Sequence, residues 1–369
     1  MVSFELSDEQ RMVQETVASF ARDQMEPLMR ESEEAGAVPE EVIAKGWELG
    51  LLGGCVPEDY EGYGEGLSAL TSAIALEELG AGDLAMALHL MSPTALAYAV
   101  LDQGTEEQRK EYLPRFCEEE FVPAACALVE PKYDFCPSAL TTTAEREYDE
   151  YVLNGKKCLV ALAKESELML VFAATQPGMG FAGVQGFIVP RDTKGVEIGE
   201  REKNMGVNAL ATYPVTFKDC RVPVGLKLGG EEGSDFLRLL SRCRLALASL
   251  AVGMSKRAVQ HSRDYARERV AFGEPIGSRQ AIAFMLAEMA IEVDATRMLV
   301  WEAAWRCDKG IDFCKEAALA KNYAADMAMM VGDRSVQIMG GHGYIRENPV
   351  ELWFRNARGL AAFEGMVMV

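Results

Sequence analysis

The spacing of apolar residues changes twice along this chain of 369 residues, and this change limits the folds that it can adopt. In the first third, Val13, Val17 and Phe20 recur on one face at helical spacing. They follow the capping box Ser7–Gln10, and a second capping box, Thr105–Gln108, precedes another helical stretch. The first part of the chain is therefore predicted to be helical.

From about residue 121 to residue 230, β-branched and aromatic residues alternate with polar ones, which is typical of strands. Residues 151–155, 168–174, 186–190 and 213–217 are predicted strands, and Asn154-Gly155 is a predicted turn. No helix-length apolar pattern interrupts them, so the segment is expected to form a small β domain and not a βαβ array.

Helical periodicity returns near Ser234 and then persists in three long, Ala-rich stretches at residues 249–267, 279–307 and 311–339. Long helices of this kind favour a bundle whose exposed faces can pair with other subunits. The chain is therefore predicted to be an α+β multidomain protein. Its expected parts are an N-terminal helical domain (1–121), a middle β domain (122–232) and a C-terminal helical bundle (233–369).

The charge balance argues against nucleic-acid binding. The formal net charge is −20, and no cluster of basic residues offsets it, so phosphate backbones would be repelled. The nine cysteines are scattered without a C-x-x-C pair, and the three histidines lie far apart. We therefore expect no metal site, and we expect free thiols in a reducing cytoplasm.

Residues 84–101 carry no formal charge and approach the length of a membrane span. His89, Ser92 and Pro93 interrupt the centre of this segment, and no basic residues flank it. A buried core helix is the expected outcome, and no membrane span is predicted. The N-terminal residues also lack the basic and apolar regions of a secretory signal.

Three glycine-containing segments are candidate ligand sites. Residues 178–183 match G-x-G-x-x-G, but a strand follows them where a dinucleotide site needs a helix, so a loop is predicted. Residues 269–280 place an arginine, an aromatic residue and a glycine turn before a helix, a combination that suits a diphosphate. Residues 337–344 hold three glycines at a helix end, which permit a left-handed turn and close approach of a planar ligand.

The last two segments, RVAFGEPIGSRQ and QIMGGHGY, resemble the acyl-CoA dehydrogenase family. The resemblance spans nearly the whole chain and includes Glu77-Glu78-Leu79 and the hairpin that ends in Val222-Pro223. It implies a helical domain, a β domain and a four-helix C-terminal bundle. It also implies an FAD-dependent oxidoreductase that converts an acyl-CoA to a 2-enoyl-CoA and passes electrons to an electron-transfer flavoprotein.

The resemblance also implies which residues form the reaction site. Members of the family use a glutamate to remove the α-proton, and Glu364 in the triplet Phe363-Glu364-Gly365 matches it. Other members place the base before a helical arginine that matches Arg244, but this chain has Cys243 there. We therefore expect Glu364 to be the base, with Arg244, Phe363 and Gly365 contacting substrate.

The FAD-binding positions match the family unevenly. On the diphosphate and adenylate side, which crosses a subunit boundary, the matching residues are Arg269, Phe272, Gln280, Gln337, Gly340 and Gly341. At the flavin ring, Val129 and Ala161 stand where the family has hydroxyls, and Leu159 stands where it has an indole. Phe135 replaces a small serine near the path of CoA.

Three functions remain open on these grounds. The first is an FAD-dependent acyl-CoA dehydrogenase that forms a homo-oligomer, either a tetramer or a dimer. The second is a divergent, flavin-poor member that acts as a non-oxidative acyl-CoA enzyme or as one subunit of a heteromeric dehydrogenase. The third is a helical binding or scaffold protein without chemistry. Glu364 and the two glycine segments argue against the third function. Between the first two, Glu364 favours the first, whereas Leu159, Ala161 and Phe135 favour the second.

Overall fold

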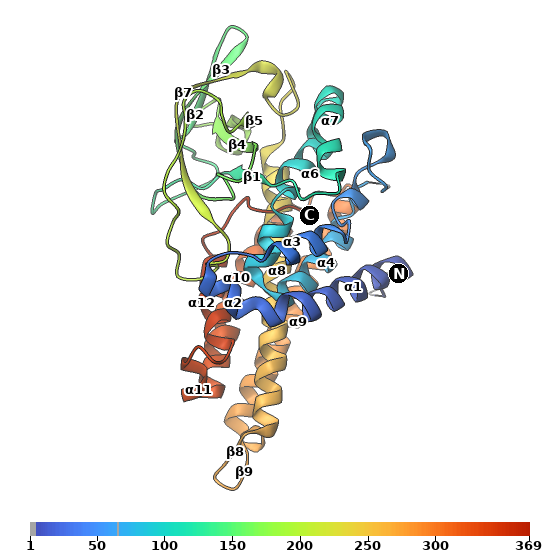
Figure 1. Ribbon diagram of the computed structural model, residues 1–369, viewed down its shortest axis with the longest axis vertical. Helices are drawn as coiled ribbons and strands as arrows, with labels where there is room; N and C mark the ends of the chain where they lie inside the picture. Colours follow the sequence, from blue (N-terminus) through green and yellow to red (C-terminus); the bar gives the residue numbers. More distant parts are fainter. Residues whose placement is uncertain (1–4, 65) are drawn as a thin grey trace.

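The computed structural model describes residues 5–64 and 66–369 and contains a helical part, a β part and a second helical part, in that order (Figure 1). The N-terminal helices are α1 (Asp8–Phe20), α2 (Met29–Ala35), α3 (Glu40–Trp47), α4 (Ala69–Gly82), α5 (Leu84–Met91), α6 (Thr94–Gln103) and α7 (Glu106–Tyr112). Both predicted capping boxes are present, at Ser7 before α1 and at Thr105 before α7. The predicted order of helical and β parts is confirmed.

The uncharged segment 84–101 forms two helices where a single helix was expected. Helices α5 and α6 meet at a bend of 43°. Pro93 lies at this bend, and it lacks the N–H needed to continue the hydrogen bonds of α5. Most side chains of both helices are buried in the protein. Within the described ranges, no single helix is long and apolar enough to cross a membrane, although this bent pair passes by length and composition.

Two buried carboxylates connect the N-terminal helices to the C-terminal bundle. The Arg297 Nε lies 3.0 Å from both carboxylate oxygens of Glu77, and the Lys256 Nζ lies 2.8 Å from Glu78. Because buried charges need partners, these ion pairs link α4 to the bundle helices. The Glu77-Glu78 pair therefore has a structural role in this chain.

The middle part is a seven-stranded sheet in the order β1-β4-β2-β3-β7-β6, with β5 paired to β4. Its strands are β1 (Ala124–Ala127), β2 (Thr143–Glu147), β3 (Glu150–Ala161), β4 (Leu168–Ala174), β5 (Val184–Pro190), β6 (Val196–Ile198) and β7 (Thr212–Pro223). Each of the four predicted segments lies in a strand. The glycine-rich residues 178–183 end in a short 3-10 helix followed by β5, which agrees with the rejection of a dinucleotide site.

The predicted turn at Asn154-Gly155 is wrong. These residues lie inside β3, next to a shift in its pairing with β7. A side chain at Gly155 would lie 2.5 Å from the Thr142 hydroxyl, so glycine is needed there for close packing. The turn between β2 and β3 occurs instead at Tyr148-Asp149, where Tyr148 has a φ of 59°.

A fully buried ion pair lies under the loop that follows β1. The Lys157 Nζ is 3.1 Å from Glu130 and also donates to the Leu128 carbonyl. Burial alone would raise the pKa of Glu130, but Lys157 and hydrogen bonds from Thr141 and Thr142 lower that pKa to about 2. Burial lowers the pKa of Lys157 to about 8 in spite of Glu130. The pair fixes the position of residues 128–130 relative to β3.

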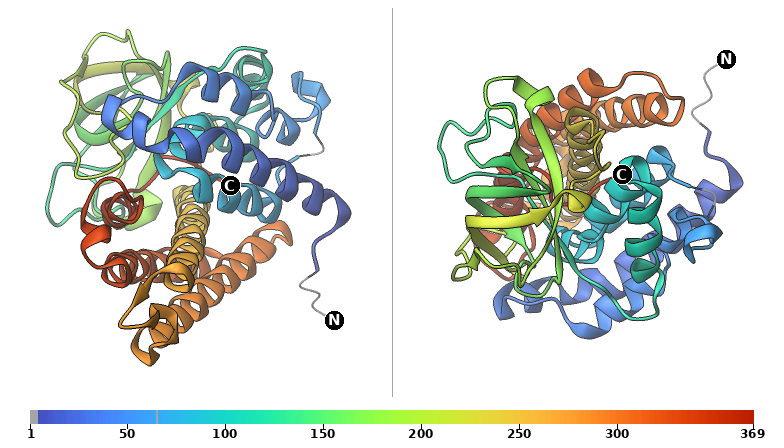
Figure 2. Two further views of the ribbon diagram at one scale, coloured as in Figure 1. Left: turned by 60° about the horizontal axis from the view of Figure 1, so that its bottom comes forward. Right: turned by 90° about the horizontal axis from the view of Figure 1, so that it is seen from above.

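The C-terminal part contains four long helices: α8 (Phe236–Glu268), α9 (Gln280–Asp308), α10 (Cys314–Met339) and α12 (Val350–Leu360). The hairpin of β8 (Val270–Ala271) and β9 (Glu274–Pro275) joins α8 to α9, and the short α11 (Gly341–Tyr344) follows α10. Helix α8 runs from the β domain to this hairpin, and the other helices of the bundle pack beside it (Figures 1 and 2). The predicted four-helix bundle is confirmed.

Candidate functional site

A cavity of about 630 Å³ lies where the β domain meets the end of the bundle. Five residues singled out from the sequence, Glu364, Arg244, Val129, Leu159 and Phe135, come together in its wall. The full lining is Val129, Glu130, Pro131, Lys132, Tyr133, Phe135, Pro137, Cys158, Leu159, Arg244, Ala361, Ala362 and Glu364. The other lining residues were not predicted, and only their proximity in sequence to predicted residues pointed to them; they are Glu130, Pro131, Lys132, Tyr133, Pro137, Cys158, Ala361 and Ala362.

Glu364 follows the end of α12 and faces Arg244 of α8. The Arg244 Nε donates to Glu364 Oε1 over 3.2 Å, and the two side chains are 17% and 14% exposed. The other oxygen, Oε2, is buried and has no hydrogen-bond partner within residues 5–64 and 66–369. An unpaired buried carboxylate oxygen is costly, so its presence beside a cavity indicates a group that meets a ligand.

The residues on either side of Glu364 do not line the cavity. Phe363 is buried in the main hydrophobic core. Gly365 has a φ of 75°, and a side chain there would lie 3.1 Å from Leu128. Both residues are therefore placed to hold the Glu364 backbone against β1 and the bundle, and their predicted substrate contacts remain predictions.

The wall predicted to face a flavin ring is apolar. Val129 and Leu159 line the cavity, whereas Ala161 is buried in the core and does not. Leu159 has a φ of 54°, and its N–H donates to the Glu202 carboxylate over 3.0 Å. Among the described lining residues there is no serine or threonine, so neither can supply a hydroxyl to a ring in this cavity.

Arg269, Phe272 and Gln280 lie together around the β8–β9 hairpin, at the end of α8 away from the β domain (Figure 1). All three are exposed, and Phe272 is 96% exposed at a φ of 56°. Within the described chain, the Arg269 side chain has no hydrogen bond or ion pair. Among the described residues, Phe272 contacts the Arg279 guanidinium, whose central carbon lies 5.9 Å from the ring centroid.

Gln337, Gly340 and Gly341 lie at the junction of α10 and α11 and are also exposed. Gly340 has a φ of 57°, and no heavy atom of the described chain lies within 4 Å of a side chain built at either glycine. The Tyr265 hydroxyl, one turn before Arg269, lies 3.4 Å from His342 Nδ1. The glycines and the hairpin therefore belong to the same end of the bundle, and open space lies beside the glycines.

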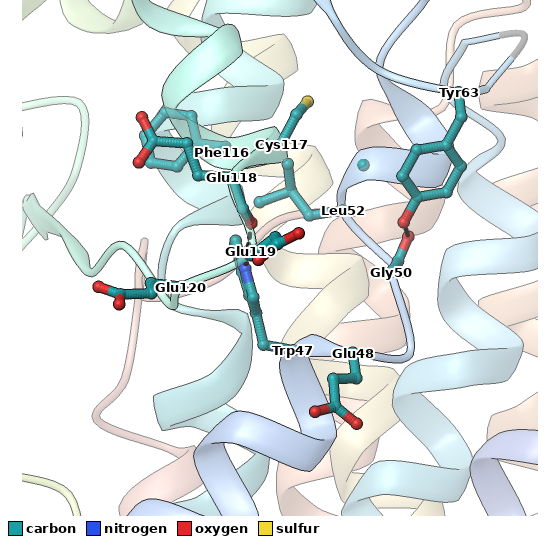
Figure 3. A pocket seen from close by; sticks show the side chains of 11 residues that line it. Trp47, Glu48, Gly50, Leu52, Tyr63, Phe116, Cys117, Glu118, Glu119 and Glu120 are labelled. Atoms are coloured by element: carbon teal, nitrogen blue, oxygen red, sulfur yellow. Dashed lines mark hydrogen bonds between the residues drawn. The ribbon is translucent and has the colours of Figure 1, made fainter.

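A second cavity, of about 540 Å³, lies in the N-terminal part (Figure 3). Its lining includes the carboxylates of Glu48, Glu118, Glu119 and Glu120. The Trp47 indole beside them donates to the Glu118 carbonyl over 2.9 Å. No residue predicted from the sequence lines this cavity, so it lies apart from the site around Glu364.

Comparison with known proteins covers nearly the whole chain. Residues 7–120 match the acyl-CoA dehydrogenase N-terminal domain, residues 125–220 match the middle domain, and residues 234–367 match the C-terminal domain. The matched ranges coincide with the helical, β and helical parts of the structure.

Individual relatives agree with these matches. The chain is 35% identical to an acryloyl-CoA reductase (NADH) of Anaerotignum propionicum over 99% of this chain and 93% of that protein. It is 34% identical to the mitochondrial short-chain specific acyl-CoA dehydrogenase of Sus scrofa over 98% of this chain and 88% of that protein. The structure of butyryl-CoA dehydrogenase from Megasphaera elsdenii superimposes with a TM-score of 0.89 at 32% identity, covering 98% of this chain and 96% of that one. With three matching domains in the same order and relatives that extend over the full length, this chain belongs to the acyl-CoA dehydrogenase family.

Proposed function

We propose that this protein oxidises an acyl-CoA thioester to the 2-enoyl-CoA, with Glu364 as the base that removes the α-proton and FAD as the hydride acceptor. The observation that carries the proposal is the free, buried Oε2 of Glu364 beside the cavity. A general base must reach the proton that it removes, and this oxygen has no competing partner among the described residues.

Arg244 orients the carboxylate of the proposed base. Its Nε holds one oxygen of Glu364, so the carboxylate has a defined orientation and the second oxygen stays free to accept a proton. Val129 and Leu159 add an apolar part to the wall of the cavity that Glu364 lines.

The chain offers groups that fit the diphosphate and adenylate half of FAD. The free guanidinium of Arg269 can form charge-assisted hydrogen bonds to a phosphate, and Gly340 and Gly341 leave their backbone open to a close ligand. Phe272, Gln280 and Gln337 lie in the same exposed segments. FAD, when bound, supplies the acceptor for the β-hydride, and an electron-transfer flavoprotein is the proposed partner that reoxidises it.

We predict that Arg269→Ala weakens FAD binding by about tenfold to a hundredfold, since hydrogen bonds to charged groups contribute about 1.5–3 kcal/mol. Titration of FAD into the apoprotein, followed by flavin fluorescence, measures the change. Arg263→Ala is the matched control, because Arg263 lies on the same end of α8 and pairs with its neighbour Asp264. Equal FAD affinity in wild type and Arg269→Ala would contradict the assignment.

The aliphatic wall around Val129 and Leu159 supports one alternative, a flavin-poor member that serves as a non-oxidative acyl-CoA enzyme or as a subunit of a heteromeric dehydrogenase. The absorption spectrum of the purified protein separates the two proposals. One bound flavin per chain supports the dehydrogenase, whereas a colourless protein that FAD does not reconstitute supports the alternative.

We also propose that the protein is a homo-oligomer, a tetramer or a dimer. Phe284, Ile291, Met298 and Trp305 on α9 are spaced seven residues apart and are each between 39% and 64% exposed. This α9 stripe lies on one face of the helix, and a continuous apolar stripe on a bundle helix favours pairing with another helix. If FAD binds across a subunit boundary, a second copy of the chain would also cover the exposed Phe272 and Gly340.

We predict that Ile291→Asp shifts the protein to a smaller assembly, because an unpaired carboxylate buried in an apolar interface costs several kcal/mol. Sedimentation velocity at micromolar concentration measures the mass. The same change at Met12, which is 67% exposed on α1, is the control. A wild-type monomer, or an unchanged mass in Ile291→Asp, would refute the role of the α9 stripe.

We also propose the domain boundaries and the cellular location of the protein. The domain boundaries are placed near residues 121 and 232, in the links between the helical and β parts. A cytoplasmic location is inferred from the nine cysteines, all of which are free.

A further inference from the structure

We propose that Tyr133 and Lys132, on the rim of the cavity that Glu364 lines, bind the nucleotide part of the CoA thioester. In this arrangement the Tyr133 ring stacks on the adenine base, and the Lys132 ammonium pairs with a phosphate. The proposal rests on the proposed function and extends it from the reacting acyl group to the residues that recognise the carrier of that group.

The cavity has a buried end and an exposed end. At the buried end, the side chains of Glu364 and Arg244 are 14% and 17% exposed. At the other end, the exposed residues 131–133 line the cavity from the loop between β1 and β2, and the exposed residues 361–362 line it from the end of α12. The cavity therefore opens between this loop and the end of α12.

A CoA thioester is a long molecule, in which the extended pantetheine chain separates the thioester from the diphosphate and the adenosine. A general base must lie within reach of the proton that it removes, so the α-carbon is placed at Glu364. The pantetheine then leaves the cavity by its open end. The nucleotide consequently lies beside residues 131–133 and not at the buried end.

Tyr133 presents a free aromatic ring at this open end. It lines the cavity and is nevertheless 104% exposed, so its ring packs against little of the described chain. A tyrosine offers a large contact area at a low cost in conformational entropy, and an aromatic ring can stack on any base. An adenine base would therefore cover a ring that the chain itself leaves in water.

Contacts on both sides of Tyr133 hold its loop in place. The Lys132 N–H donates to the Glu130 carbonyl over 2.7 Å, and the Phe135 N–H donates to the Lys132 carbonyl over 3.2 Å. Glu130 is paired with the buried Lys157, and Phe135 packs against a hydrophobic core. Because the loop is already ordered, little conformational freedom is lost when a base stacks on the ring.

Lys132 provides a positive charge at the open end. It and Arg244 are the only basic residues among the described lining residues, and Arg244 is paired with Glu364. The Lys132 Nζ lies 3.7 Å from Asp134, and the two side chains are 43% and 60% exposed. Such an exposed pair is weak, so the ammonium can turn to a phosphate. Since Asp134 offsets part of the charge, we expect stacking to contribute more to binding than the ammonium does.

Calorimetric titration of the FAD-loaded protein with crotonyl-CoA and crotonyl-pantetheine tests the proposal. The two thioesters share the acyl group and differ by the nucleotide, and both already carry the double bond, so neither is oxidised during the titration. Tyr133→Ala should weaken the binding of crotonyl-CoA by about fivefold to a hundredfold, the range for stacking of one base on an aromatic ring. The same variant should bind crotonyl-pantetheine as wild type does.

Two further variants separate stacking from charge. Tyr133→Trp should keep the affinity for crotonyl-CoA, because an indole stacks on a base as well. Lys132→Ala should weaken the binding of crotonyl-CoA by about twofold to fivefold at low salt, and this effect should vanish at high salt. Tyr148→Ala is the matched control, because Tyr148 is 95% exposed in the same β part and lines neither of the two cavities described above.

The comparison of the two thioesters decides the outcome. An equal loss of affinity for both in Tyr133→Ala, or no loss for crotonyl-CoA, would overturn the proposal. A loss confined to crotonyl-CoA supports it. If that loss is found but wild type oxidises no butyryl-CoA, the nucleotide site stands and the proposed function alone is wrong.

Discussion

Glu364→Gln is expected to lower kcat by about two to four orders of magnitude, the usual contribution of a general base, while acyl-CoA binding persists. The amide nearly preserves the shape of the carboxylate and can still accept the Arg244 hydrogen bond through its carbonyl oxygen. It cannot accept the α-proton. Steady-state oxidation of butyryl-CoA with an artificial electron acceptor gives kcat, and calorimetry gives the dissociation constant of the thioester.

The control for this substitution is Glu48→Gln, an exposed glutamate that lines the second cavity. It should leave turnover unchanged, because that cavity contains none of the predicted site residues. Unchanged turnover in Glu364→Gln would eliminate Glu364 as the base. If Glu48→Gln lost most of its turnover while Glu364→Gln stayed fully active, the reaction would be assigned to the second cavity.

Lys157→Met is expected to reduce the free energy of unfolding by about 3–5 kcal/mol, the usual cost of leaving one partner of a buried ion pair unpaired. Both side chains of the pair are buried, with Lys157 0% exposed and Glu130 2% exposed. Without the ammonium, the Glu130 carboxylate keeps its hydrogen bonds from Thr141 and Thr142 but loses its counter-charge. Urea denaturation followed by circular dichroism measures the loss.

Lys156→Met is the matched control, because Lys156 is next to Lys157 in the sequence but its side chain is exposed. This substitution should change the free energy of unfolding by about 0.5 kcal/mol or less. The double variant Glu130→Leu with Lys157→Met should recover much of the loss, since removing both charges leaves none unpaired. A loss in Lys157→Met no larger than in Lys156→Met would refute the role of the pair.

The pH dependence of the free energy of unfolding provides a second test of the Glu130–Lys157 ion pair. The pKa of Glu130 falls from 4.5 to about 2 on folding. A carboxyl whose pKa is lowered in the folded state contributes stability above its unfolded pKa, and this contribution is lost as the pH falls through the folded value. Wild type should therefore lose stability between pH 4.5 and about 2, and the double variant should lose less.

The order of the domains and the ends of several helices were predictable because they depend on neighbouring residues. Ser7–Gln10 and Thr105–Gln108 each satisfy backbone groups within one helical turn, so a capping box acts wherever it occurs. The short apolar run of residues 168–174 is likewise a local property, and that segment is β4. Asn154-Gly155 shows the limit of such reasoning, because Asn154 pairs with Thr143 of β2 and Gly155 pairs with Phe217 of β7, so that a strand continues where a turn was expected.

The features of the candidate site also fall into those that the sequence predicts and those that depend on tertiary contacts. The sequence by itself determined the family resemblance, the triplet around Glu364 and the glycine-rich segments, since these are runs of adjacent residues. Only the tertiary structure decided that Arg244 holds one oxygen of Glu364 and leaves the other free, that Ala161 lies away from the cavity, and that Met366 enters the core. Each of these depends on contacts between residues far apart in the chain. Such contacts depend on how whole helices and strands pack against one another. The residues next to a given position in the sequence say little about that packing.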